Sequence, residues 1–194
     1  AVSLAYPLQL LLIAASVGTA VGVNSLVARK LGEKNFEQAN SASTHGLVLC
    51  VFTYAFFLLL GIFGVRPFMT AFSGGNARVV DAGVQYFTCV LCLSVFSIIQ
   101  VMIEKTLQAT GNMIYPMLFQ LLGAVVNIIF DPLLIFGVGI FPEMGVLGAA
   151  VATVFGQFCG MVFALAVLFT KSHKVKIRLR GFRFDKMTVK NIYA

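Results

Sequence analysis

Three polar side chains share one face of a predicted helix in an otherwise apolar part of the sequence. Asn127 and Asp131 are four residues apart, and Gln120 falls on the same stripe, because steps of 100° per residue bring all three within about 20° of one direction. Pro132 has no N–H to donate, which leaves the Ile128 carbonyl as a further acceptor. Carboxylate, amide and carbonyl oxygens suit a hard cation such as Na⁺, or a proton held on a buried carboxyl. We therefore interpret Asp131 and Asn127 as candidate ligands of Na⁺ or of a proton.

The same stripe has a second interpretation, as a contact between helices. Polar side chains and a proline kink in a membrane helix can serve only to hold neighbouring helices together. A carboxylate costs about 2.5–3.5 kcal/mol on insertion scales at the centre of a span, and Asn or Ser would supply such a contact at lower cost. The charge of Asp131 favours the cation site, and both interpretations stay open on sequence alone.

Two other predicted helices carry polar stripes. Gln100 and Glu104 lie within about 60° of each other on one helix face, while Thr153 and Gln157 share a face of a later helix. Glu104 is followed by Lys105, so we interpret it first as one half of an ion pair at the membrane interface. The residues predicted to line a polar cavity are Gln100, Glu104, Gln120 and Gln157.

Long apolar segments carry all of these residues. The sequence has 194 residues, of which 59% are hydrophobic and 11% charged, and its mean hydropathy is +0.95, values that exclude an ordinary soluble domain. Stretches long enough to cross about 30 Å of hydrocarbon predict five membrane-spanning helices. They cover residues 4–28, 44–65, 82–103, 115–138 and 146–170. The expected fold class is an all-α integral membrane bundle over residues 1–170, followed by a basic segment at 171–194.

The positive charges predict an orientation. Twelve of the fourteen Lys and Arg residues lie in segments 29–40 and 104–114 or after residue 170, and the other two are Arg66 and Arg78. The positive-inside rule places the twelve in the cytoplasm, which predicts a multi-pass protein of the cell membrane whose main partner is the lipid bilayer. Because the net charge of +7 belongs largely to the tail, it does not indicate nucleic-acid binding. The first predicted span enters from outside without a signal peptide, so we expect a helix that precedes it.

Motifs for enzymatic chemistry are absent from the sequence. It contains no GxxxxGK(S/T), HExxH or GxSxG pattern, which are the signatures of nucleotide, zinc-protease and serine-hydrolase sites. The CxxC of Cys89 and Cys92 lies among apolar residues without a second pair to complete a metal site. We expect neither an enzyme nor a cofactor. The last predicted span carries small residues at four-residue spacing, typical of close helix packing: Gly148, Ala152, Gly156 and Gly160.

Several segments resemble the multidrug and toxic compound extrusion (MATE) family. They are GVNSLVARKLGEKN (22–35), QATGNMIYPM (108–117), NIIFDPLLIFG (127–137) and GVLGAAVATVFGQ (145–157). The resemblance covers essentially the whole chain. It implies the second to sixth helices of a six-helix N-terminal lobe, with residues 171–194 as a cytoplasmic linker between lobes. A first helix and a C-terminal lobe would then complete the protein.

The resemblance also implies a function, which is cation-coupled antiport. In this family Na⁺ or H⁺ drives the export of amphipathic, often cationic, drug-like compounds by alternating access. Asn127 and Asp131 match a pair of fifth-helix ligands of prokaryotic members in identity and spacing, and Thr153 resembles a sixth-helix Thr ligand. The first-helix Asp that completes the family's site has no counterpart here, so we expect that this chain does not transport alone.

Two alternative functions stay open. A lipid-linked oligosaccharide flippase of the same superfamily would share the fold, but we expect such a protein to have a more basic cavity than these spans, which carry no Lys or Arg in their middle. A non-transporting membrane scaffold would use the polar stripes only for assembly. Replacing Asp131 with Asn separates the last case from transport, because a scaffold should tolerate the change and an antiporter should not.

Overall fold

The computed structural model describes residues 2–72, 77–137, 139, 141–170, 175 and 184–193. Within that part of the chain every regular element is a helix, which confirms the expected all-α fold class. The elements are α1 (Val2–Gly32), α2 (Phe36–Leu59), the π-helical turn η1 (Leu60–Gly64), α3 (Val65–Phe72), α4 (Ala77–Cys92), α5 (Val95–Ala109), α6 (Ile114–Phe136), α7 (Val146–Thr170) and α8 (Lys186–Tyr193).

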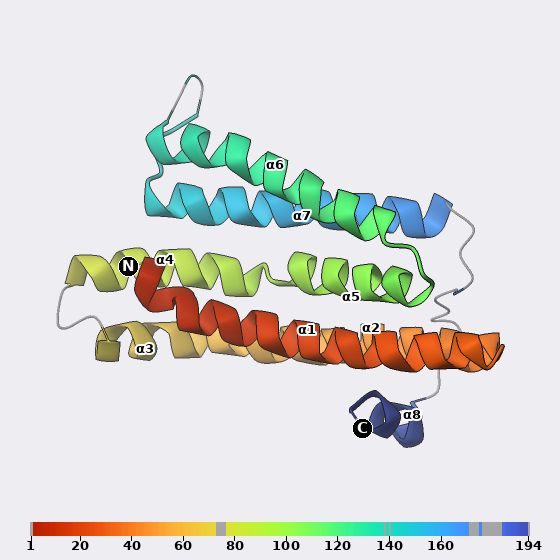
Figure 1. Ribbon diagram of the computed structural model, residues 1–194. Helices are drawn as coiled ribbons and strands as arrows, with labels where there is room; N and C mark the ends of the chain where they lie inside the picture. Colours follow the sequence, from red (N-terminus) through yellow and green to blue (C-terminus); the bar gives the residue numbers. More distant parts are fainter. Residues whose placement is uncertain are drawn as a thin grey trace.

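The long helices stack in three layers (Figure 1). α1 lies with α2 and α3, α4 and α5 follow each other in the middle layer, and α6 pairs with α7. The middle layer joins the other two, because α5 contacts both α1 and α7 and α4 contacts α7. The α1–α2 and α5–α6 connections and the end of α7 lie at the same end of the bundle. These are the segments that the charge distribution assigns to one side of the membrane.

The helices are long and apolar enough to cross a membrane four times, or five times if α4 and α5 count as one span. Helices α1, α6 and α7 correspond to the predicted spans 4–28, 115–138 and 146–170. The predicted span 44–65 is the middle of one continuous helix of 37 residues, Phe36–Phe72.

The predicted span 82–103 falls on two consecutive helices rather than on one. α4 and α5 meet at an angle of 45°, and Leu93 and Ser94 form the break between them. Neither residue is Gly or Pro, so no local breaker marks the place. The local sequence therefore does not indicate the bend.

Short-range chemistry sets several helix ends. Asn35 caps α2, because its side-chain oxygen accepts the Gln38 N–H over 3.1 Å. α6 ends at Gly137, which has φ +65° and donates its N–H to the Leu133 carbonyl. A Cβ at Gly137 would lie 2.6 Å from the Glu143 backbone nitrogen. Both the backbone conformation and the space at this position therefore require glycine.

The segment expected to be a linker contains α8. Asp185 caps this helix, since its carboxylate accepts the Thr188 hydroxyl over 2.6 Å and the N–H groups of Met187 and Thr188 over 3.0 Å each. The Thr188 hydroxyl first, and then these backbone donors, hold the pKa of Asp185 below its ordinary value. The basic run 174–180, expected to be a solvated linker or to lie on the membrane surface, falls outside the described residues apart from Val175.

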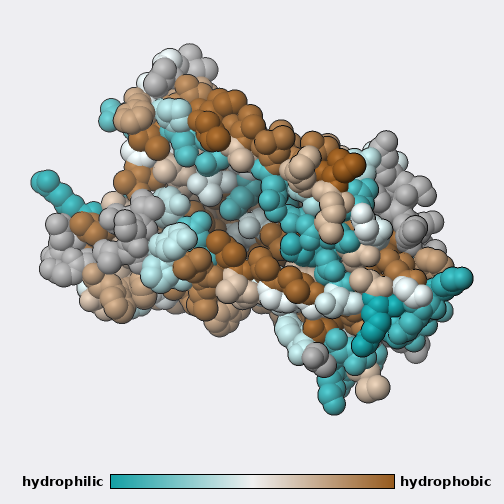
Figure 2. All heavy atoms as spheres, viewed as in Figure 1, coloured by the Kyte–Doolittle hydropathy of each residue, from teal (hydrophilic) through white to brown (hydrophobic). Residues whose placement is uncertain are grey.

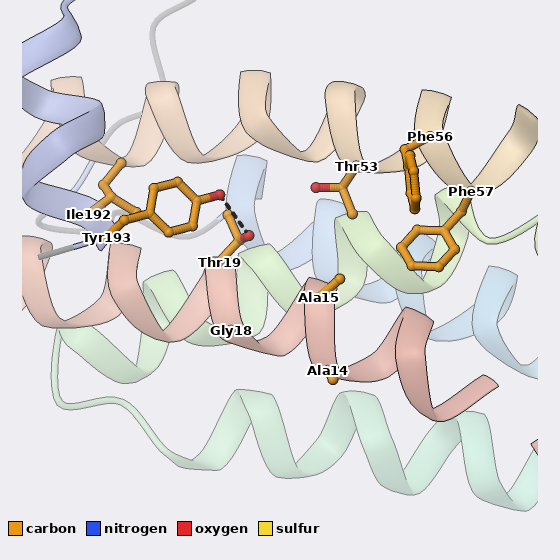
Figure 3. Close-up of a pocket in the computed structure, with 9 residues that line it drawn as sticks. All are labelled: Ala14, Ala15, Gly18, Thr19, Thr53, Phe56, Phe57, Ile192 and Tyr193. Atoms are coloured by element: carbon orange, nitrogen blue, oxygen red, sulfur yellow. Dashed lines mark hydrogen bonds between the residues drawn. The ribbon is translucent and has the colours of Figure 1, made fainter. Parts of the chain in front are cut away.

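Helix α8 packs against α1 and α2. The Ile192 carbonyl lies where a Cβ of Gly22 would be, so glycine at this position of α1 lets the two backbones meet. The Tyr193 hydroxyl lies 3.0 Å from Thr19 Oγ1 at one end of a cavity of about 610 Å³ between α1 and α2 (Figure 3). Phe56 lies at the other end of this cavity.

Candidate cation site and polar cavity

The predicted pair on α6 meets Thr153 of α7. Asn127 Nδ2 lies 3.4 Å from Thr153 Oγ1, which donates its own proton to the Ala149 carbonyl over 2.9 Å. If the Asn127 amide is turned, which satisfies its neighbours better, Nδ2 donates to Asp131 Oδ2 over 3.1 Å. Its Oδ1 then accepts the Thr153 N–H over 3.2 Å. In the turned orientation Asn127 links the carboxylate of α6 to α7.

Two buried acceptors in this region have no donor. Among the described residues, nothing donates a hydrogen bond to Asp131 Oδ1 or to Gln157 Oε1. A buried polar atom left without a partner costs about 1–3 kcal/mol. A cation or a proton at the Asp131 carboxylate would remove this cost.

Close approach of α6 and α7 makes the meeting of these side chains possible. A Cβ at Gly156 would lie 2.7 Å from the Gly123 carbonyl oxygen and 3.4 Å from Asn127 Cβ. A Cβ at Gly148 would collide with the Leu134 carbonyl. The close packing predicted from the spacing of small residues is confirmed at these positions.

A cavity of about 270 Å³ lies beside the pair, between α5, α6 and α7. Figure 2 shows hydrophilic side chains gathered in the hollow between the α6–α7 layer and the helices below it. Amide groups, one hydroxyl and small residues form the lining, and none of the eight lining residues is charged. They are Gln100, Gln120, Gly123, Ala124, Asn127, Thr153, Gly156 and Gln157. The structure thus brings three of the four predicted lining glutamine and glutamate residues together with Asn127 and Thr153, while Asp131 lies one helical turn beyond.

Glu104 is the exception, because it does not line this cavity. Its Oε1 accepts the Gln120 amide over 3.0 Å and the Gln108 amide over 3.2 Å, and Lys105 Nζ lies 3.5 Å away. The predicted ion pair with Lys105 is present, and Glu104 itself is only 3% exposed. Contact between α5 and α6 buries the carboxylate, which holds Gln120 in place at the edge of the cavity.

Tyr86 of α4 joins the site although no sequence pattern pointed to it. Its side chain is 6% exposed and lies within interaction range of the Thr153 and Asp131 side chains. A single tyrosine in an apolar helix gives no spacing signal. The packing of α4 against α7 is what brings Tyr86 to Thr153.

Comparison with known proteins assigns the family. Residues 1–133 match the sequence profile of the MatE family. This chain belongs to the MatE family. It is 28% identical over 187 residues to the FAD transporter of Shewanella oneidensis. The aligned part covers 96% of this chain and 41% of that protein. It is 29% identical over 163 residues to the probable multidrug resistance protein NorM of Thermotoga maritima, covering 84% and 34% of the two chains. The chain spans about two fifths or less of the length of these relatives.

Solved MATE structures share the fold. An outward-facing multidrug resistance MATE transporter superposes with a TM-score of 0.90 at 26% identity, over 98% of this chain and 42% of that one. An inward-facing structure of a multidrug resistance MATE transporter superposes with a TM-score of 0.89 at 26% identity, over 97% of this chain and 42% of that one. A MOP superfamily transporter from Pyrococcus furiosus superposes with a TM-score of 0.90 at 26% identity, over 98% of this chain and 41% of that one. The chain therefore shares the fold of structures solved in both conformations.

Proposed function

We propose that the protein containing this chain is a cation-coupled antiporter that exports amphipathic or cationic compounds across the cell membrane, and that this chain supplies five helices of its N-terminal lobe. The incomplete carboxylate of Asp131, joined through Asn127 to Thr153 inside a membrane bundle, carries the proposal. The relatives, named as a FAD transporter and a multidrug resistance protein, support transport rather than catalysis. A first helix and a C-terminal lobe would be its partners within the same protein.

The coupling ion, Na⁺ or H⁺, binds at Asp131 in this proposal. Asn127 and Thr153 supply further oxygens for Na⁺, whereas a proton needs only Asp131 Oδ1. A bound ion drives transport only if it binds one conformation more tightly than the other.

The lining of the cavity supports a neutral or cationic substrate. Amide and hydroxyl groups can orient an amphipathic compound, and two carboxylates, of Glu104 and Asp131, accept hydrogen bonds from the lining residues Gln120 and Asn127. A lipid-linked oligosaccharide carries a diphosphate and would need basic groups, which these lining residues do not provide. FAD carries a diphosphate as well, so we do not extend the substrate of the Shewanella relative to this protein.

Efflux of a fluorescent cationic dye tests the proposal. Cells expressing the complete reading frame are compared with cells expressing Asp131→Asn, while Na⁺ and external pH are varied. We expect wild-type efflux to depend on a Na⁺ or H⁺ gradient, and Asp131→Asn to export no more dye than cells without the protein, at equal membrane expression. Asp81→Asn is the matched control, because Asp81 is exposed near the start of α4. Wild-type efflux from Asp131→Asn would show that Asp131 is a packing residue.

A further inference from the structure

His45 of α2 uses both of its ring nitrogens in hydrogen bonds. Its Nε2 accepts the backbone N–H of Asp185 over 2.9 Å. Because an accepting nitrogen carries no proton, the proton of the neutral ring is on Nδ1, which donates to the Ser41 carbonyl over 2.8 Å. The side chain is 1% exposed. His45 therefore joins α2 to the residue that caps α8.

Two further contacts hold α8 on the layer of α1 and α2. The Phe184 ring lies against His45, with the ring centroids 5.9 Å apart and the planes at 44°. At the other end of α8, the Ile192 carbonyl occupies the space that a Cβ of Gly22 would need, and the Ile192 side chain is buried. Since His45 belongs to α2 and Gly22 to α1, α8 is docked on both helices.

The docked α8 forms one end of the cavity between α1 and α2 (Figure 3). Ile192 and Tyr193 line this end, and the Tyr193 hydroxyl meets the Thr19 hydroxyl there. All other lining residues belong to α1 and α2. Thr19 is nearer to the α1–α2 connection than the α1 residues that line the rest of the cavity. Without α8 in this place, the end of the cavity on the side of that connection would be open.

The lining of this cavity suits an amphipathic compound. Phe56 offers an exposed aromatic ring, Thr53 a hydroxyl group, and none of the nine lining residues is charged. A volume of about 610 Å³ lies within the range of about 300–1,000 Å³ that holds drug-sized ligands. The cavity shares no lining residue with the polar cavity between α5, α6 and α7, so the two are separate.

We propose that α8 is a lid on the cytoplasmic end of the α1–α2 cavity, and that the hydrogen bond from the Asp185 N–H to His45 is its latch. The positive charges predict that this end of the bundle faces the cytoplasm. While the latch is made, Ile192 and Tyr193 close the end of the cavity. When it breaks, α8 leaves Gly22 and an amphipathic compound enters from the cytoplasm. Only the class of compound rests on the proposed function.

Hydrogen exchange in the purified complete transporter tests the latch. His45→Phe keeps an aromatic ring against Phe184 but removes the acceptor of the Asp185 N–H. We expect the amides of residues 189–192 to exchange about threefold to tenfold faster than in wild type, the equivalent of one hydrogen bond. His45→Gln is the matched control, because its side-chain oxygen offers an acceptor at a similar reach, and it should stay near wild type. Equal exchange in His45→Phe and wild type overturns the latch, and so does equally fast exchange in both variants.

Thiol labelling from the cytoplasmic side tests the lid. Thr53→Cys places a thiol in the cavity, and a membrane-impermeant trimethylammonium methanethiosulfonate is added to inside-out vesicles. The same protein without Thr53→Cys gives the background from the native cysteines. Adding His45→Phe should make labelling about threefold to tenfold faster, whereas adding His45→Gln should leave the rate near that of Thr53→Cys alone.

Tyr193→Ala separates the lid from the latch. It removes a side chain that closes the cavity but leaves the bond between Asp185 and His45. Labelling at Thr53→Cys should therefore rise about threefold or more, while the Met187 and Thr188 amides exchange as in wild type. Labelling that neither Tyr193→Ala nor His45→Phe accelerates overturns the lid. Since these readouts need neither transport nor a cation, a failure of cation-coupled efflux would remove the proposed function alone.

Discussion

Two carboxylates in the same bundle have opposite surroundings: Glu104 is buried, whereas Asp131 is partly exposed. Glu104 accepts two side-chain amides and has Lys105 Nζ 3.5 Å away. Asp131 has Asn127 beside one oxygen, and none of the described residues donates to the other. The hydrogen bonds of Glu104 suit it to holding α5 and α6 together, whereas the oxygen of Asp131 without a donor is the reason why we propose a ligand there.

The largest expected effect comes from separating α6 and α7. This change disrupts the contacts around Asp131 but does not alter a residue that contacts Glu104. In Gly156→Ala the new methyl group would lie 2.7 Å from the Gly123 carbonyl oxygen. We expect a loss of about 3 kcal/mol, as for an overpacked core, together with loss of the cation response. Thermal unfolding in detergent measures it. In the control Gly18→Ala, nothing lies within 4 Å of the new methyl group, so equal stability of the two variants would contradict the packing described here.

A smaller effect on stability distinguishes the two carboxylates themselves. Glu104→Ala leaves the amides of Gln108 and Gln120 without their acceptor and should lower the free energy of unfolding by about 1–3 kcal/mol. Asp131→Asn removes a charge that lacks a complete set of donors, so its stability should equal or exceed that of wild type. If Asp131→Asn is less stable than wild type while Glu104→Ala is not, the contrast drawn here between the two carboxylates is wrong.

The third prediction concerns the hydroxyl between α6 and α7. Thr153→Val keeps the shape of the side chain but removes the oxygen next to Asn127. The half-saturating cation concentration should rise about twofold to tenfold, and Thr153→Ser should stay near wild type. Cation titrations of efflux or of melting temperature measure the shift. Equal behaviour of the Val and Ser variants would show that the hydroxyl takes no part in the site.

The smallest effect lies outside both regions, at the start of α8. Asp185→Ala should speed hydrogen exchange of the Met187 and Thr188 amides at neutral pH, because both lose their acceptor, while cation dependence stays unchanged. The pKa of Asp185 is lowered in the folded protein, so its cap is fully present above the ordinary pKa of about 4. The cap is lost as the pH falls through the lowered value. Exchange rates that match wild type at neutral pH would show that the cap does not protect α8.

Sequence reasoning located the parts of the candidate site that share one helix. The spacing of Asn127 and Asp131 put them on one face of α6, and the small residues of α7 indicated that a partner helix comes close. Both signals are local, since they depend on helical periodicity alone. Thr153 came from the family resemblance, and the structure places it against Asn127.

Features that depend on contacts between helices were not predictable in this way. The pair of Glu104 with Lys105 was predicted from adjacent residues, but sequence does not show that Gln120 of another helix also donates to the carboxylate. The break between α4 and α5 contains no helix-breaking residue, and the tyrosine near Thr153 has no periodic partner. In each case the decisive neighbour is distant in sequence.

The 37-residue helix Phe36–Phe72 is longer than the membrane that it crosses. At 1.5 Å per residue it measures about 55 Å, against about 30 Å of hydrocarbon, and the exposed Arg66 lies at the end of its uncharged stretch. Bilayers of different thickness would therefore meet this helix at different levels and change its tilt. Because Met69 near its end is set into α4 at Gly83, we expect the lobe to sense the lipid composition of its membrane through the same helix that supports α4.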